Sequence, residues 1–124
     1  MNKAERISKA LKFLERNGYV LHATSPKGGI DLIVFKDNDP DTAIFVAVMP
    51  LKSKAFPMQP FKGKQGELRY NSLMAGASKW IDDVDWKGKI RFDTVTVHDT
   101  NGLIDHIENA GRKELRLVHH RACI

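Results

Sequence analysis

The chain has 124 residues, of which 42% are hydrophobic and 28% charged, which is ordinary for one globular domain with a hydrophobic core. No run approaches the roughly 18 apolar residues of a membrane span, and the N-terminal segment is charged rather than signal-like, so we expect a cytoplasmic protein without membrane contact. The single cysteine, Cys123, excludes an internal disulfide, and the net charge of +5 favours an acidic partner, nucleic acid first.

The N-terminal segment predicts a helix over residues 2–17. Asn2, with Glu5 three residues later, forms a capping arrangement, and apolar residues then recur at helical spacing. Asn17, followed by glycine, is a stop signal. The next apolar residues predict a short strand over 19–23.

The stretch from Gly28 to Met49 predicts a β-hairpin around which the domain is organised. Two apolar runs, Ile30–Phe35 and Ala43–Met49, flank the polar segment Lys36–Thr42. Both faces of the second run are apolar, which is typical of a central strand covered on both sides. Pro50 is expected to end this strand, because proline cannot donate to the ladder.

Asp31 is the only charged residue inside either apolar run. A lone carboxylate in an apolar strand costs on the order of several kcal/mol unless it is partnered or used. Two interpretations stay open. Asp31 is either an active-site carboxylate, or a structural residue bonded to backbone N–H groups or paired with a lysine.

The second half of the chain predicts a long loop, a helix and two strands. The loop covers residues 50–66, the helix 67–82, and the strands 90–97 and 103–107, with Asn-Gly as the turn between them. The expected order of elements is αβββαββ. Residues 111–124 form a basic tail that fits either a strand or a helix.

Basic residues gather in the predicted loop and continue onto the predicted second helix. Between Lys52 and Arg69 there are five basic residues and one acid, interleaved with Phe56 and Phe61, a weak signal for binding single-stranded nucleic acid. The residues expected to contact phosphates are Lys52, Lys54, Lys62, Lys64, Arg69 and Lys79.

Five separated segments resemble one known family. AERISKALKFLERNGYVL, GGIDLIVF, IFVAV, ASKWI, and IRFDTVTV with IDHIENAG look like the YraN-like proteins, an endonuclease-like family of the PD-(D/E)XK nuclease superfamily. The resemblance implies an α/β, restriction-endonuclease-like fold, with a mixed β-sheet flanked by helices. It assigns residues 1–110 to the endonuclease-like domain and leaves the tail, 111–124, outside it.

The resemblance also implies a metal site on the hairpin. In that superfamily an Asp on the first strand and a Glu on the second hold a divalent cation, and a Lys two residues beyond the Glu polarises the attacking water. Asp31 stands at the metal-binding position, and Glu5 matches the Glu of the family's first helix. Departures from the pattern occur at Gly29, at Ala47 in place of the second-strand Glu, and at Met49 in place of the Lys.

Because the catalytic set is not intact, we expect a nuclease-fold protein that binds nucleic acid, DNA first, without cleaving it. Asp31 remains the only metal candidate, so no cofactor is expected, or Mg²⁺ or Mn²⁺ if the protein is active. Two alternatives stay open: a metal-dependent endonuclease with relocated catalytic residues, such as Lys52 or Lys54, and a protein-interaction domain with no nucleic-acid role. A homodimer is also left open.

Other ionisable residues are expected to have ordinary roles. Asp93 is predicted to be a framework residue paired with a cation rather than a catalyst. The histidines show no metal-ligand spacing; they are His22, His98, His106, His119 and His120.

Overall fold

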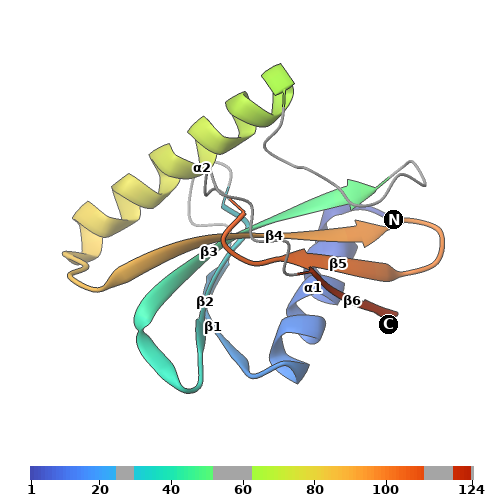
Figure 1. The fold of residues 1–124 in the computed structure, drawn as a ribbon, viewed down its shortest axis with the longest axis horizontal. Helices are drawn as coiled ribbons and strands as arrows, with labels where there is room; N and C mark the ends of the chain where they lie inside the picture. Colours follow the sequence, from blue (N-terminus) through green and yellow to red (C-terminus); the bar gives the residue numbers. More distant parts are fainter. Residues whose placement is uncertain (25–29, 52–62, 111–118, 124) are drawn as a thin grey trace.

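The computed structural model describes residues 1–24, 30–51, 63–110 and 119–123, which form one mixed sheet and two helices (Figure 1). The predicted α/β class is confirmed, and the tail segment left open between strand and helix contributes a strand, β6. The elements are α1 (Lys3–Arg16), β1 (Tyr19–Thr24), β2 (Leu32–Lys36), β3 (Asp39–Leu51), α2 (Gly63–Val84), β4 (Lys89–His98), β5 (Leu103–Ile107) and β6 (His119–Cys123).

The sheet follows the order of the chain, β1-β2-β3-β4-β5-β6. Strands β3 and β4 are parallel, and every other neighbouring pair is antiparallel. A parallel pair needs a crossover connection, and α2 lies within it. Strand β3 is therefore central, and its residues 43–49 are all buried, as the sequence predicted for a strand covered on both faces.

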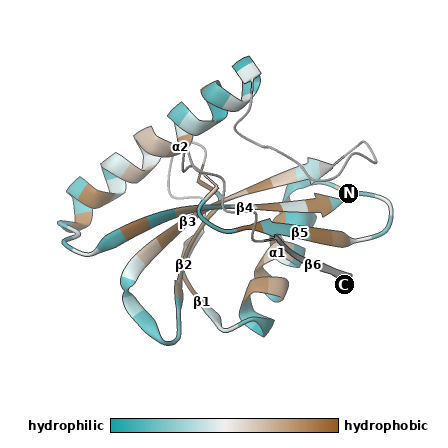
Figure 2. Ribbon diagram, viewed as in Figure 1, coloured by the Kyte–Doolittle hydropathy of each residue, from teal (hydrophilic) through white to brown (hydrophobic). Residues whose placement is uncertain are grey.

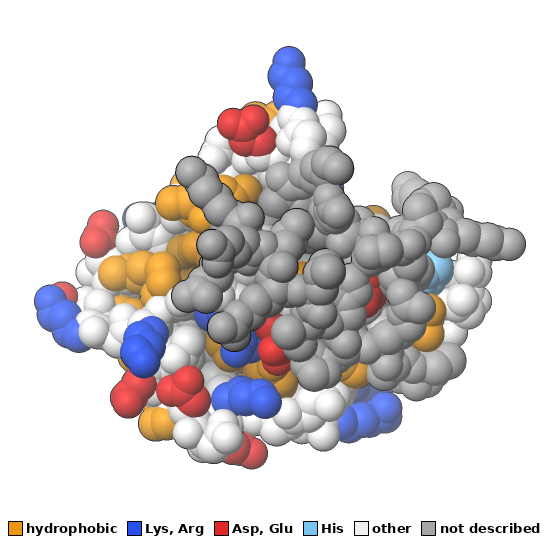
Figure 3. Space-filling view, in the orientation of Figure 1, with side chains coloured by type: hydrophobic (Ala, Val, Ile, Leu, Met, Phe, Trp, Pro, Cys, Tyr) orange, Lys and Arg blue, Asp and Glu red, His pale blue; other side chains and the backbone are white. Residues whose placement is uncertain are grey.

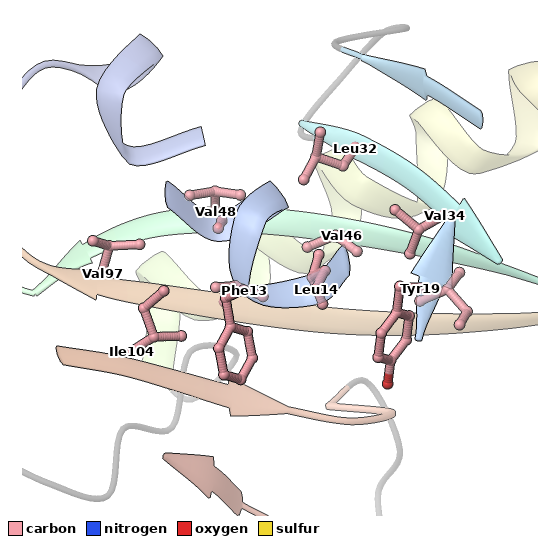
Figure 4. Packing of buried hydrophobic residues seen from close by; sticks show 12 residues of the cluster. Phe13, Leu14, Tyr19, Leu32, Val34, Val46, Val48, Val97 and Ile104 are labelled. Atoms are coloured by element: carbon pink, nitrogen blue, oxygen red, sulfur yellow. The ribbon is translucent and has the colours of Figure 1, made fainter. Parts of the chain in front are cut away.

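Helix α1 covers one face of the sheet. Its Leu14 is 0% exposed and lies beside Val46 of β3, in a buried cluster that also contains Val97 of β4 and Ile104 of β5 (Figure 4). These residues share a face because alternate residues of a strand point the same way. A continuous apolar layer under α1 results.

Helix α2 covers the other face. Leu73 and Ala77 of α2 join a second buried cluster with Ile33 of β2 and Phe45 of β3. The ring of Trp80 meets Phe45 edge to face, with 5.5 Å between centroids. Figure 2 shows hydrophobic residues along the central strands, whereas the first turns of α2 and the turn between β2 and β3 are hydrophilic.

The capping residues of α1 act as predicted. The Asn2 side chain accepts a hydrogen bond of 2.8 Å from the backbone N–H of Glu5, which satisfies one of the unpaired donors at the helix start. The helix ends at Asn17, and Gly18 adopts a φ of +84°, a conformation that glycine reaches without steric cost.

The hairpin turn is shorter than the polar segment suggested. Strand β3 begins at Asp39, which pairs with Lys36, so residues predicted as loop lie in the strand. Local hydrogen bonds offset the polar composition: Thr42 donates to the Asp39 carboxylate at 2.8 Å. Thr42 also pairs with Lys89 of β4, and this long-range pairing is invisible to a local pattern.

The expected strand end at Pro50 is wrong, because β3 continues to Leu51 and Pro50 pairs with Val97 of β4. Val46 and Val48 both direct backbone groups to the β2 side, where they bond to Asp31. Backbone groups two residues apart point the same way, so the nitrogen of Pro50 faces the β2 side as well. Its missing N–H therefore costs no bond to β4.

Helix α2 is longer than predicted. It begins at Gly63 rather than at residue 67 and ends at Val84 rather than at 82. The first turn contains no apolar residue, so hydrophobic periodicity gave no signal for it. Within the described part of the chain, neither helix is both long and apolar enough to cross a membrane.

The docking of α2 on the sheet can be tested with two leucines of the same helix. Leu73→Ala is expected to lower the free energy of unfolding by about 2 to 5 kcal/mol, because it leaves a cavity in the core, whereas Leu68→Ala should change it little, since Leu68 is 58% exposed. Chemical denaturation measures both. Equal losses in the two variants would contradict the packing of α2.

Candidate functional site

Asp31 lies directly before β2 and is 7% exposed. Its backbone N–H donates to the Val46 carbonyl at 2.9 Å, and its Oδ2 accepts from the Val48 N–H at 2.7 Å. Its Oδ1 lies 3.3 Å from the ammonium of Lys3 in α1. Both carboxylate oxygens therefore have partners from the chain itself, and these are the two contacts that the structural interpretation of Asp31 named.

The geometry explains why a hydrogen-bond acceptor is needed at this point. The β2–β3 pairing begins with Leu32 opposite Val46, and β3 runs on past the start of β2. The N–H of Val48 thus extends beyond the ladder, and the side chain of Asp31 accepts its bond in place of a backbone carbonyl. The ammonium of Lys3, at the start of α1, compensates the buried charge of Asp31.

The two other hairpin positions lie on β3 and carry apolar side chains. One step beyond the Leu32–Val46 pair, the register places Asp31 opposite Ala47. Ala47 is 3% exposed and Met49 is 6% exposed, and both are apolar. Glu5 is exposed in the first turn of α1, and no hydrogen bond or ion pair among the described residues joins it to Asp31.

These residues do not fit a divalent cation. Magnesium and manganese favour several oxygen ligands, usually with one or two carboxylates among them. Asp31 offers oxygens that are already occupied by a backbone N–H and an ammonium. The part of the chain that the structure describes holds no group of three or more His, Cys, Asp or Glu side chains able to bind a metal.

A buried polar network lies on the α1 side of the sheet, at the β1, β4 and β5 strands. Asp93 is 0% exposed, and its carboxylate accepts two hydrogen bonds from Arg91, at 2.9 and 2.8 Å. Its Oδ2 also lies 2.8 Å from Nε2 of His106, and its Oδ1 accepts from the backbone N–H of Asn109 at 2.9 Å. Asp93 is the paired framework residue that the sequence predicted.

Tyr19 extends this network toward the surface. Its hydroxyl donates to Glu108 at 3.0 Å and accepts from Arg91 at 3.1 Å. Burial raises the pKa of the Tyr19 hydroxyl well above its usual range, and the nearby Asp93 charge raises it further. The hydroxyl therefore stays protonated. The rings of Tyr19 and Phe13 each pack edge to face against the imidazole of His106.

The partners within the network shift the pKa values of Asp93 and Arg91. Burial alone would raise the pKa of Asp93, but the hydrogen bond and charge of His106, followed by those of Arg91, outweigh burial and lower it. Burial also disfavours the charged form of Arg91, yet its bonds to Asp93 raise its pKa overall. The network is a largely buried clamp that joins three strands.

The role of His106 could not be found from the sequence, because it depends on which strands are neighbours. The antiparallel register places His106 opposite Val95, on the face that carries Asp93. A histidine in LIDHI has no local feature that separates it from an exposed one. The spacing of Arg91 and Asp93, two residues apart on one strand, was the available signal.

A second set of polar residues lies on the α2 side. The register sets Thr94 beside Ala47, and Thr96 between Met49 and Asp105. The hydroxyls of Thr94 and Thr96 are buried, and neither has a hydrogen-bond partner among the described residues. Together with His98 and Asp105, they form a polar row near the carboxyl ends of β3 and β4; the row lies outside the predicted site.

The predicted nucleic-acid-binding residues divide into two groups. Lys52, Lys54 and Lys62 lie outside the described residues. The other three, Lys64, Arg69 and Lys79, are exposed on α2. At about 100° per residue these three side chains fall within an arc of about 140° around the helix axis.

Neither a protein-family model nor a curated protein sequence matches this chain. The resemblance to YraN-like proteins therefore stays a prediction from the residues quoted above. What the structure establishes is a mixed α/β fold in which the hairpin carboxylate bonds to its own chain.

Two substitutions separate the hydrogen-bonding role of Asp31 from a role of its charge. Asp31→Ala leaves the buried Val48 N–H without an acceptor and is expected to cost about 1 to 3 kcal/mol of unfolding free energy. Asp31→Asn keeps an acceptor oxygen and should retain most of the stability. Denaturant unfolding at neutral pH measures both. If Asn were as damaging as Ala, the charge and not the hydrogen bond would dominate.

The Asp93 clamp predicts a dependence of stability on pH. Because its folded pKa is lowered, Asp93 stabilises the protein above its unfolded pKa of about 3.9, and this contribution is lost as pH falls further. Asp93→Asn is expected to cost on the order of 3 kcal/mol near neutral pH. The difference from wild type should shrink toward about pH 3.

The control for this measurement is Asp85→Asn, since Asp85 forms an ion pair with Lys87 in which both side chains are 82% exposed. Stability should hardly change in that variant at any pH. A difference between wild type and Asp93→Asn that stays constant from neutral to acid pH would contradict the charged clamp.

Proposed function

We propose that this protein is a nuclease-fold domain that binds nucleic acid, DNA first, without cleaving it. The observation that carries the proposal is the state of Asp31. Its carboxylate bonds to the Val48 N–H and to Lys3, and the next strand carries Ala47 and Met49 where the resemblance implies a metal-binding Glu and a water-polarising Lys.

Cleavage of a phosphodiester needs an activated water and stabilisation of the charge that develops on the phosphate. A methyl group and a thioether supply neither. Lys3 places a positive charge at Asp31, but an ammonium held by a carboxylate as an ion pair is not a general base. Binding without turnover is the chemistry that remains for the hairpin in this arrangement.

Support for nucleic acid as the partner comes from charge. The chain carries 20 Lys and Arg against 15 Asp and Glu, and the exposed Lys64, Arg69 and Lys79 of α2 can approach phosphates. Contacts of this kind fix a protein on the backbone without reading sequence. In Figure 3, however, the described Lys and Arg side chains are interspersed with Asp and Glu, so this face is only moderately basic.

One paired assay tests the proposal. Fluorescence anisotropy with labelled DNA should show binding that weakens steeply as salt rises, because phosphate contacts release counterions. Plasmid and branched DNA incubated with Mg²⁺ or Mn²⁺ should stay intact. Metal-dependent cutting that Asp31→Ala abolishes would favour a relocated active site, and the absence of salt-sensitive binding would favour a protein-interaction domain.

A further inference from the structure

The outer face of α1 carries a stripe of basic residues. Lys9, Lys12 and Arg16 follow one another at spacings of three and four residues, and at about 100° per residue they fall within an arc of about 60°. Lys12 and Arg16 are exposed, and Lys9 is partly exposed. This stripe faces away from the sheet, because the opposite side of α1 holds the buried Ala10 and Leu14.

The two helices differ in charge balance. Helix α1 contains five basic residues, Lys3, Arg6, Lys9, Lys12 and Arg16, against two acids, Glu5 and Glu15. Helix α2 contains three basic residues, Lys64, Arg69 and Lys79, against three acids, Glu67, Asp82 and Asp83. The net positive charge of the described helices is therefore concentrated on α1, on the opposite side of the sheet from α2.

The basic residues of α1 also divide by contact. Lys3 pairs with Asp31, and Arg6 pairs with Asp99 at 3.3 Å, so these two are used within the fold. Among the described residues, no ion pair engages the three residues of the stripe. Lys12 and Arg16 stand four residues apart, a like-charge spacing that costs a helix about 0.2 to 0.5 kcal/mol.

We infer that the α1 stripe of Lys9, Lys12 and Arg16 binds the phosphate backbone of a nucleic-acid strand. The inference rests on the proposed function and adds a contact surface on the other side of the sheet from α2. At about 1.5 Å of rise per residue the stripe spans about 10 Å, which matches roughly three successive phosphate-to-phosphate intervals along one strand of a duplex. Lys36 adds a positive charge on the same side, where its ammonium lies 5.2 Å from the Tyr19 ring centre.

A nucleic acid fits this surface better than a membrane. An amphipathic helix binds a lipid surface by inserting its apolar side. In α1 that side is already packed against the sheet, with Leu14 at 0% and Phe13 at 5% exposure (Figure 4). The stripe therefore offers charge without an insertable apolar face, and charge alone suits a phosphate backbone.

Two matched triple variants test the inference by anisotropy with labelled duplex DNA over a range of salt. Lys9→Gln, Lys12→Gln and Arg16→Gln together should reduce the slope of log K against log salt by about 2 to 3, since each lost phosphate contact removes about 0.9. Lys64→Gln, Arg69→Gln and Lys79→Gln together should reduce it less. Glu15→Gln, which removes an acid beside the stripe, should tighten binding.

The outcomes separate this inference from the proposed function. Absence of DNA binding by the wild type would remove the proposed function and the inference with it. Wild-type binding with an unchanged slope in the α1 triple variant would overturn the inference alone. Binding of the wild type to anionic phosphatidylserine vesicles, lost in the α1 variant while DNA binding persists, would also overturn it. Circular dichroism checks that both variants are folded.

Discussion

The structure depends on the burial of β3 on both faces. This strand lies between antiparallel β2 and parallel β4, and α1 and α2 cover its two sides with separate apolar clusters. A parallel neighbour requires a crossover, so the position of α2 follows from the pairing of β3 with β4. Phe45 on one face and Val46 on the other, both 0% exposed, hold the two layers together.

The same strand explains the hairpin carboxylate. Strand β3 is longer than β2, so the N–H of Val48 extends past the paired residues and needs a hydrogen-bond acceptor. Asp31 provides it, and Lys3 balances the charge. A carboxylate that suggested catalysis from its sequence context is thus explained by hydrogen bonding at the end of a strand, with apolar Ala47 and Met49 beside it.

Much of the candidate site was accessible to local patterns, and the remainder depended on register. Asp31 was identified as a charge within an apolar run and Asp93 from its place in the IRFDTVTV segment, and their structural alternatives named the kind of partner later seen. His106 and the row with Thr96 were missed. Their meaning comes from neighbours on β4 and β5 that alternation within one strand cannot supply.

The sequence by itself determined the class of each main element, the cap of α1 at Asn2, the central and doubly covered character of β3, and the apolar side chains of Ala47 and Met49 on that strand. These features are local, set by periodicity, capping and residue type. The tertiary structure decided the partners of Asp31, the extension of β3 through Pro50, and the clamp around Asp93. Those depend on which backbone groups meet across strands, which pairing alone fixes.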